Sequence, residues 1–360
     1  MTFESLPPAP EPQQEQQPPR VQDRGRFGPG AAIGTLIGIV VTAAFALGAV
    51  WMLTNQQRII DQFVVWEYEP DAAIVGYADR AELTEEGRFL FYASRPEVAP
   101  EDEFDQICSA GNEGFGILGC YLPDERRIYL YDVTDGRLDG LEEVVATHEM
   151  LHAVWARMSQ QERDAIGPLL EAEAAELADN EAFAATMEFY AENEPGQRLN
   201  ELHSILGTEF GDLSPALEAH YARYMSDRPA IVALHDQSNA VFLEQQARAD
   251  TLITQIDALV AGIEADYAVY SSGYTVLNAD IDAFNERADA GDFPSQSQFD
   301  AERNAILTRK AELDALYATI EERDAQYDQL VLDLEALNEE IDGLNASINI
   351  DPPDVPDLSG

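Results

Sequence analysis

The residues whose types and spacing could support chemistry lie in one short stretch, His148-Glu149-Met150-Leu151-His152. Two histidines four residues apart on a helix lie on the same face, about one turn from each other. Both imidazole rings can then reach one metal ion, and Glu149 can take a proton from a water bound to that ion. We therefore predict one Zn²⁺ per chain, with His148 and His152 as metal ligands and Glu149 as a catalytic residue.

The residues around this motif predict a helix with a defined start and end. Asp139 and Glu142 form a D-x-x-E pattern that predicts a capping box, and Ser159 with Glu162 predicts a second capping box that starts the next helix. Apolar residues between them predict a broad buried face, as expected of an active-site helix. The alternative is an amphipathic helix with two incidental histidines. The chain has only 5 histidines, however, and the motif uses two of them.

The charge of the chain excludes one class of partner. The 360 residues include 68 acidic and 21 basic side chains, which give a formal net charge of −47. Phosphate binding needs clustered positive charge, so we expect no nucleic-acid partner. An acidic surface contributes mainly solubility and self-repulsion.

The two cysteines of the chain, Cys108 and Cys120, enclose a glycine-rich segment. If this segment lies outside the cytoplasm, we expect a disulfide that closes the loop, which stabilises the fold by about 3 kcal/mol. The alternative is a pair of zinc ligands. That alternative needs a C-x-x-C-like spacing and further ligands nearby, both of which the sequence lacks.

The N-terminal region predicts a membrane anchor. Residues 1–30 are rich in Pro, Gln and Glu and predict a disordered cytoplasmic tail. Residues 31–53 carry no charge, and their number matches a bilayer-spanning helix. Three arginines precede this segment, so the positive-inside rule predicts a cytoplasmic N-terminus and an extracytoplasmic catalytic domain. The alternative is a cleaved signal peptide, whose apolar core usually has only about 7–15 residues.

Residues 58–235 are predicted to form the catalytic domain. Runs of β-branched and aromatic residues predict strands at 73–77, 89–92 and 128–133. The last run is expected to be an edge strand along which an extended peptide lies. From residue 141 onward the pattern is helical, and a small sheet followed by helices is an α+β architecture. Helix breaks are predicted at residues 167–168, 179–180, 194–196, 214–215 and 227–229.

Residues 236–348 show two long apolar seams with steps of three and four residues. A break at residues 288–298 separates the seams, so we predict an antiparallel coiled-coil hairpin folded on itself. The alternative is a dimeric coiled coil, and in either form the hairpin could bind a protein partner. Residues 349–360 are rich in Pro and Asp and predict a disordered tail.

A catalytic zinc ion needs a third protein ligand and an open position for water. Glu171 lies 19 residues after His152, but it belongs to an acidic run that is also typical of a solvated helix face. The segment 200–208 is more distinctive, because an asparagine and a glutamate precede a serine, a glycine and a threonine. The candidates for the third ligand are Glu171, Glu173, Glu201, His203, Glu209 and His220.

The H-E-x-x-H motif followed by N-E-x-x-S-x-x-G-T at residues 200–208 resembles thermolysin-like gluzincins. The resemblance covers two helices and little else. It implies a zincin-like metallopeptidase fold with Glu201 as the third zinc ligand, and Glu171 and His203 remain the alternatives. The chain departs from the family in two respects. The gap between the motifs is long, and Ile205 replaces the acidic residue that orients a zinc-bound histidine, so another residue must take that role.

The resemblance also implies a histidine or tyrosine donor where negative charge develops on the attacked carbonyl. His220 and Tyr221 are the catalytic candidates, and the alternative is a buried helix with polar tips. The implied function is a membrane-anchored zinc metallopeptidase with a protein or peptide substrate. A second hypothesis, from a different class, is an inactive zincin-fold envelope scaffold that binds a protein partner through its coiled coil.

Overall fold

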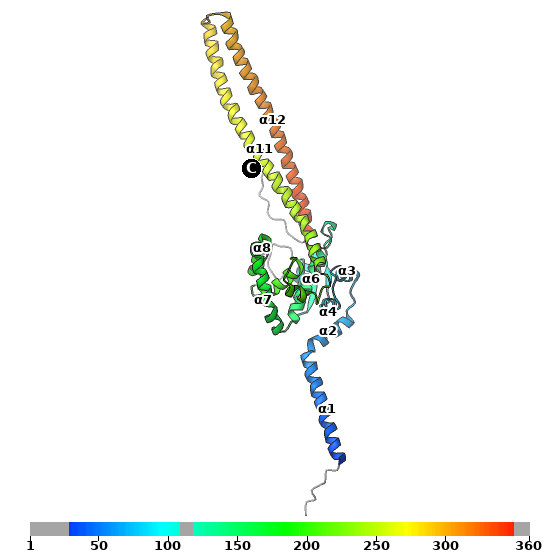
Figure 1. The fold of residues 1–360 in the computed structure, drawn as a ribbon. Helices are drawn as coiled ribbons and strands as arrows, with labels where there is room; N and C mark the ends of the chain where they lie inside the picture. Colours follow the sequence, from blue (N-terminus) through cyan, green and yellow to red (C-terminus); the bar gives the residue numbers. More distant parts are fainter. Residues whose placement is uncertain (1–28, 109–117, 194, 349–360) are drawn as a thin grey trace, which may run out of the picture. The chain divides into compact units, whose positions relative to one another are not determined.

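The computed structural model describes residues 29–108, 118–193 and 195–348 (Figure 1). The chain divides into two compact units, residues 1–59 and 60–360. Within the described residues the fold is mostly helical, with one three-stranded sheet. The elements in chain order are α1 (Pro29–Thr54), α2 (Gln56–Glu67), α3 (Ala72–Arg80), α4 (Glu85–Ala93), β1 (Glu97–Ala99), α5 (Glu101–Cys108), β2 (Gly119–Leu122), β3 (Arg127–Tyr131), a 3₁₀ turn η1 (Gly136–Leu138), α6 (Leu141–Arg157), α7 (Gln160–Glu176), α8 (Glu181–Asn193), α9 (Arg198–Thr208), α10 (Pro215–Tyr221), α11 (Arg228–Asp289) and α12 (Gln296–Ala346).

The N-terminal unit contains α1, which covers the charge-free segment 31–53. Its large apolar side chains from Val40 onward are exposed, Phe45 and Leu53 most of all. Over the part of the chain that the structure describes, no helix is both long and apolar enough to cross a membrane. This finding does not support the predicted transmembrane helix. Residues 1–28 of the predicted N-terminal tail (residues 1–30) and the predicted tail at residues 349–360 lie outside the described residues, and residues 29 and 30 belong to α1.

Two of the three predicted strands are helices. The segments 73–77 and 89–92 lie within α3 and α4. A capping side chain starts each helix: Asp71 accepts a hydrogen bond from the amide of Ile74, and Thr84 accepts one from the amide of Gly87. The strand prediction was wrong because a short apolar run has the same composition in a strand and in a buried helix face.

The third predicted strand is confirmed as β3, but its expected position at an edge is wrong. The strand order is β1-β3-β2, with β1 parallel to β3 and β2 antiparallel to it. The last four residues of β3 are all buried, as expected for a strand that is covered on both faces. The strands at the edges are β1 and β2, each of only three or four residues, and β2 packs against α6.

The start of α6 differs from the prediction, and its end agrees with it. Gly140 caps α6 in the left-handed conformation (φ 99°), which glycine adopts without strain. No capping box forms there, because Asp139 pairs with Arg80 and Glu142 accepts a hydrogen bond from the Tyr77 hydroxyl. The second predicted capping box, Ser159 with Glu162, is confirmed at the start of α7.

The predicted helix breaks hold except for the first. Pro168 lies inside α7, which continues from Gln160 to Glu176. The helix persists because Ile166, Leu170 and Ala174 bury one continuous face in the core, which outweighs the local cost of proline. The other four breaks fall between α7 and α8, between α8 and α9, at the start of α10 and at the start of α11.

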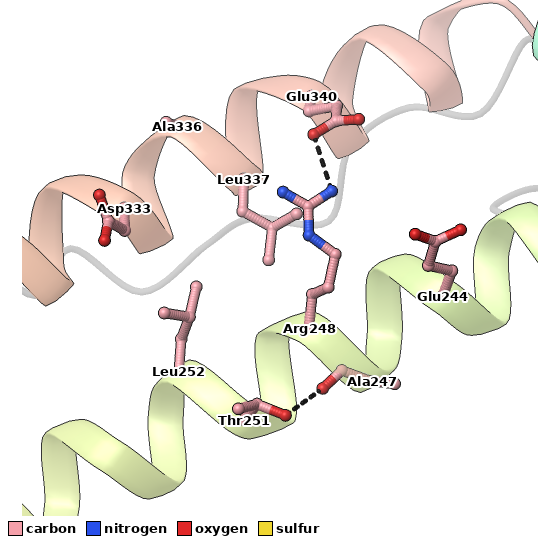
Figure 2. A pocket seen from close by; sticks show the side chains of 9 residues that line it. All are labelled: Glu244, Ala247, Arg248, Thr251, Leu252, Asp333, Ala336, Leu337 and Glu340. Carbon is pink, nitrogen blue, oxygen red and sulfur yellow. Dashed lines mark hydrogen bonds and ion pairs between the residues drawn. The ribbon is translucent and has the colours of Figure 1, made fainter.

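The C-terminal hairpin is confirmed. Helices α11 and α12 lie side by side in opposite directions (Figure 1), and we call them the arm. Its inner seam buries Leu277, Leu313, Ile320, Leu337 and Leu344. A shallow groove crosses the arm beside the ion pair of Arg248 with Glu340, 3.1 Å apart (Figure 2).

We call residues 60–227, the rest of the second unit, the body. The first turns of α11 lie inside this body. Ile231 and Val232 of α11 are buried, and Ile231 belongs to the main core of the body. Helix α11 then continues out of the body without a break at the predicted domain boundary between residues 235 and 236. Leu344 and Ile348 at the end of the arm close a small cluster with Leu138.

Candidate metal centre

The candidate site lies where α6 packs against α9, since each helix carries one of the two sequence motifs. Leu151 of α6 and Leu202 and Leu206 of α9 are fully buried in this contact. Gly207 allows the close approach, because a Cβ atom there would lie 2.4 Å from Leu151 Cδ1. The packing of two apolar faces therefore brings the polar faces of both motifs together.

The three predicted metal ligands converge on one point. His152 Nε2 lies 3.6 Å from Glu201 Oε2, and His148 Nε2 lies 3.9 Å from the same oxygen. The ligand atoms of His148, Glu149 and His152 lie within 4.8 Å of one another. Ligand atoms around a tetrahedral zinc ion are about 3.3 Å apart at ordinary bond lengths. The two distances from Glu201 Oε2 to the histidine nitrogens exceed this value by about 0.3 and 0.6 Å, so these two nitrogens and one oxygen could close on a zinc ion by small side-chain movements.

Burial keeps both histidines in the form that binds metal. It lowers the pKa of His152 to about 4 and holds the pKa of His148 well below its usual value. Ser204 Oγ lies 3.1 Å from His152 Nδ1 and donates its own hydrogen to the carbonyl of Asn200. Ser204 must then accept a hydrogen bond from Nδ1–H, so Nε2 of His152 presents a lone pair toward Glu201.

Glu149 occupies a tight position against strand β2. Its side chain is buried, and Gly119 of β2 lies directly beside it. A Cβ atom at Gly119 would lie 2.8 Å from Glu149 Cγ and 3.1 Å from its Oε1. Only glycine leaves this carboxylate its space, and no sequence pattern had marked Gly119 as part of the site.

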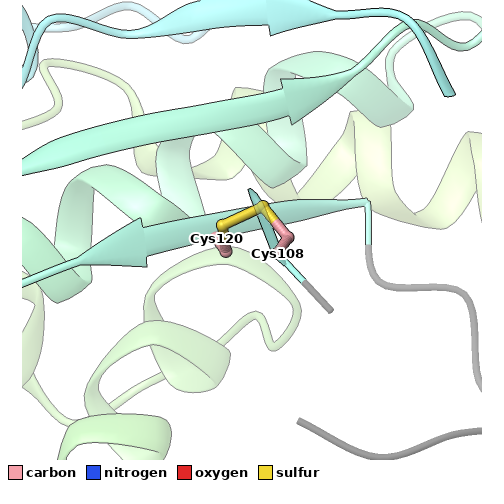
Figure 3. The surroundings of a disulfide bond; sticks show 2 residues. All are labelled: Cys108 and Cys120. Atoms are coloured by element: carbon pink, nitrogen blue, oxygen red, sulfur yellow. A yellow bond between two sulfur atoms is a disulfide. The ribbon is translucent and has the colours of Figure 1, made fainter. Parts of the chain in front are cut away.

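The disulfide between Cys108 and Cys120 is confirmed and lies on the same strand (Figure 3). The two sulfur atoms are 2.06 Å apart, and the bond joins the end of α5 to β2. Most of the glycine-rich loop that it closes falls within residues 109–117, outside the described residues. The bond therefore anchors the strand that carries Gly119.

The structure places the predicted donors His220 and Tyr221 against His203. His220 Nε2 lies 2.9 Å from His203 Nε2. Tyr221 is fully buried, and its hydroxyl donates to the backbone carbonyl of His203. The side chain of His220 also faces Glu162 and Arg223. The donor group of Tyr221 is thus already engaged within the core.

Two other candidate glutamates for the third ligand interact with other residues instead of with the motif histidines. Glu171 is exposed and pairs with Arg198 at 2.9 Å, and Glu173 accepts a hydrogen bond from the amide of Ser214. Within the described residues, only Glu201 among the candidate glutamates lies within 4 Å of both motif histidines.

Two residues that the sequence did not predict to support the site, Glu209 and His235, lie beside it. Glu209 Oε1 lies 4.0 Å from His148 Nδ1, and Glu209 Oε2 lies 4.0 Å from His235 Nε2. Burial raises the pKa of Glu209 to about 7. The sequence marks Glu209 only as a candidate metal ligand, and it gives no role to His235. No local pattern marks His235, because it follows the start of a long helix whose first turns reach the site only in the folded protein.

No family model, no curated protein and no solved structure matches this chain. Its function is therefore inferred from the residues and distances described above.

Proposed function

We propose that the protein is a zinc-dependent metallopeptidase that hydrolyses peptide bonds with a zinc-activated water. The observation that carries the proposal is the convergence of His148 Nε2 and His152 Nε2 on one oxygen of Glu201. Glu149 is buried beside these ligands, in the position of a general base. Two histidines and one glutamate are a ligand set of hydrolytic zinc sites. A bound zinc ion would polarise the scissile carbonyl and lower the pKa of its water to about 7.

The residues around the site have distinct roles in this proposal. Glu149 takes the proton of the attacking water and passes it to the leaving amine. Ser204 orients His152 through Nδ1, and Gly119 keeps space for the Glu149 carboxylate. The short edge strand β2, rather than β3, is the strand along which we expect an extended peptide to lie. The two motif helices and this edge strand are the basis for proposing a gluzincin-like fold.

We further propose that residues 31–53 anchor the protein in the cell membrane as a single pass, with the N-terminus in the cytoplasm. Three features support this placement. The segment has no charge, its apolar side chains from Val40 onward are exposed, and arginines precede it. The disulfide between Cys108 and Cys120 is typical of an oxidising compartment, which supports an extracytoplasmic body.

The first test is the zinc content of the purified full chain. We expect about one zinc per chain by elemental analysis, because the site offers three ligands to a single ion. The Glu201→Gln variant should lose this zinc. Glu171→Gln is the matched control, since it alters an exposed glutamate paired with Arg198, and it should keep the metal. A wild-type chain that binds no zinc after zinc is supplied would refute the proposal.

The second test separates metal binding from catalysis. The Glu149→Gln variant should keep its zinc and lose peptide hydrolysis by roughly 10²- to 10⁴-fold, because the amide cannot accept the proton of the water. Hydrolysis of casein or of a peptide library by the zinc-loaded wild type and variant provides the comparison. Equal rates in the two proteins would rule out Glu149 as the base.

The second candidate function is an inactive scaffold that binds a protein partner through its arm. Exposed apolar side chains on both arm helices favour it, among them Leu243, Val269, Val276 and Leu332. A wild-type protein that binds zinc but shows no hydrolysis above the Glu149→Gln background would favour this candidate over the peptidase.

A further inference from the structure

His148 needs an outer partner that the sequence motif does not supply. Histidines that bind zinc usually donate their second ring nitrogen to a carboxylate, a carbonyl or a hydroxyl, which fixes the ring and its tautomer. Ser204 serves His152 in this way. At the position where the resemblance implies an acidic partner, this chain has Ile205, which is fully buried in the apolar core.

We propose that Glu209 is the positioning residue of His148, and that His235 at the root of the arm holds Glu209 in place. This inference rests on the proposed zinc site. It extends that site by a carboxylate at the end of α9 and by a histidine of α11. One residue of the arm, His235, then also supports the metal centre.

The geometry around the His148 ring is the first support. Glu201 Oε2 lies 3.9 Å from Nε2, and Glu209 Oε1 lies 4.0 Å from Nδ1. The two carboxylates therefore address different nitrogens of one imidazole. A neutral imidazole carries one hydrogen, so donation from Nδ1 to Glu209 leaves the Nε2 lone pair for the metal. An approach of about 1 Å would turn the 4.0 Å contact into a hydrogen bond.

The helix that carries both glutamates is the second support. Glu209, the C-cap residue of α9, follows Glu201 by eight residues, which is two helical turns plus about 80°, so the two carboxylates reach His148 from neighbouring faces of the helix. Glu209 also lies four residues after Ile205, one turn farther along the helix. A shift of the carboxylate by one turn therefore supplies the partner that is missing at Ile205.

His235 is the third support. Its Nε2 lies 4.0 Å from Glu209 Oε2, and its Nδ1 lies 3.6 Å from Asp236 Oδ1. The two oxygens of Glu209 thus face two histidines from different helices. His235 lies in the second turn of α11, which starts in the core of the body and continues into the arm. Only the packing of the first turns of α11 against the body brings the His235 imidazole to Glu209.

The test measures zinc affinity in the full chain by competition with a chromophoric chelator. We expect Glu209→Ala to bind one zinc with 10- to 100-fold weaker affinity, the usual loss when an outer partner of a metal ligand is removed. Glu209→Gln should recover part of the affinity, because its amide oxygen still accepts a hydrogen bond from Nδ1. Glu171→Ala is the matched control and should bind zinc as the wild type does. Thermal unfolding of the metal-free proteins checks that each variant folds.

A spectroscopic measurement separates positioning from general stability. With Co²⁺ in place of zinc, Glu209→Ala should shift the visible absorption bands, since the orientation of His148 changes, whereas Glu171→Ala should not. A double-mutant cycle tests the link to the arm root. His235→Gln should weaken zinc binding by a smaller factor, and most of this effect should disappear in the Glu209→Ala background.

Three outcomes would overturn the inference. If Glu209→Ala binds zinc as tightly as the wild type, Glu209 has no positioning role, and the proposed enzyme stands without it. If folded Glu209→Ala loses its zinc as completely as Glu201→Gln, then Glu209 is a ligand rather than a positioning residue. If the wild type binds no zinc, the proposed function fails together with this inference.

Discussion

The body and the arm differ in how far their charged side chains are exposed to solvent. In the body, Glu149 of α6 and Glu201 of α9 are each less than 8% exposed, and so is Arg228, the first residue of α11, at the point where that helix starts inside the body. In the arm, ion pairs such as Arg309 with Asp280 keep more than 40% of each side chain exposed. Buried charges need fixed partners, whereas exposed pairs contribute little because water and salt screen them. The difference indicates where chemistry can occur, since a solvated pair has an ordinary environment and a buried one does not.

The largest expected effect is on the ion pairs themselves. Arg157→Met should destabilise the protein by about 3–5 kcal/mol, because the buried carboxylate of Asp61 would lose the guanidinium that pairs with it at 3.0 Å. Arg309→Met is the matched control in the arm and should cost at most about 1 kcal/mol, since Asp280 remains solvated. Urea unfolding of the two variants provides the free energies. Similar losses in both would contradict the contrast between body and arm.

The glycines in helices sharpen the comparison at the next level. Gly207→Ala should destabilise the body by about 1–3 kcal/mol, because the new methyl group would meet Leu151 Cδ1 and Tyr221 Cε1. Gly343→Ala in α12 meets nothing within 4 Å, so it should stabilise the protein by up to about 1 kcal/mol through helix propensity. Urea unfolding curves check both signs. A stabilising Gly207→Ala would show that α6 and α9 are not closely packed.

The smallest expected effect concerns pH. Burial lowers the pKa of His220 from 6.5 to about 4. Between these values the unfolded chain binds a proton at this residue and the folded chain does not, so stability falls as the pH falls from 6.5 to 4. His220→Gln removes this contribution and should lose about 1–2 kcal/mol less stability than the wild type as the pH falls from 6.5 to 5. Burial also lowers the pKa of His235 in α11, but this residue is the same in both proteins and so contributes equally to the two stability curves.

The measurement for His220 is urea unfolding of the metal-free proteins at several pH values. Each protein is referred to its own stability at pH 8, where His220 is neutral in both the folded and the unfolded state. Parallel stability curves for wild type and His220→Gln would show that the ring is protonated equally in the two states.

Local sequence patterns predicted several features well. The helix around His148 and His152, the capping box at Ser159 and the hairpin of two long helices are all present. Each depends on residues within a few turns of one another, so spacing along the chain is enough to predict it. The disulfide between the two cysteines was also predicted, because the chain offers no other pairing.

Features that depend on contacts far apart in the chain were predicted poorly. The segments 73–77 and 89–92 are helices because caps and tertiary burial decide between two structures with the same apolar composition. Strand β3 is central because β1, a three-residue strand too short to predict, pairs along its other side.

The sequence by itself determined which residues could bind a metal and act as a base, since motif chemistry is local. For the third ligand, the resemblance favoured Glu201 and left Glu171 and His203 open, because all three lie on predicted helices at an acceptable distance along the chain. The packing of α6 on α9 places Glu201 Oε2 at 3.6 Å from His152 Nε2 and Glu209 Oε1 at 4.0 Å from His148 Nδ1, and the first turns of α11 bring His235 to Glu209. The physical reason is that side chains from separate helices meet only where buried apolar faces fix how those helices cross.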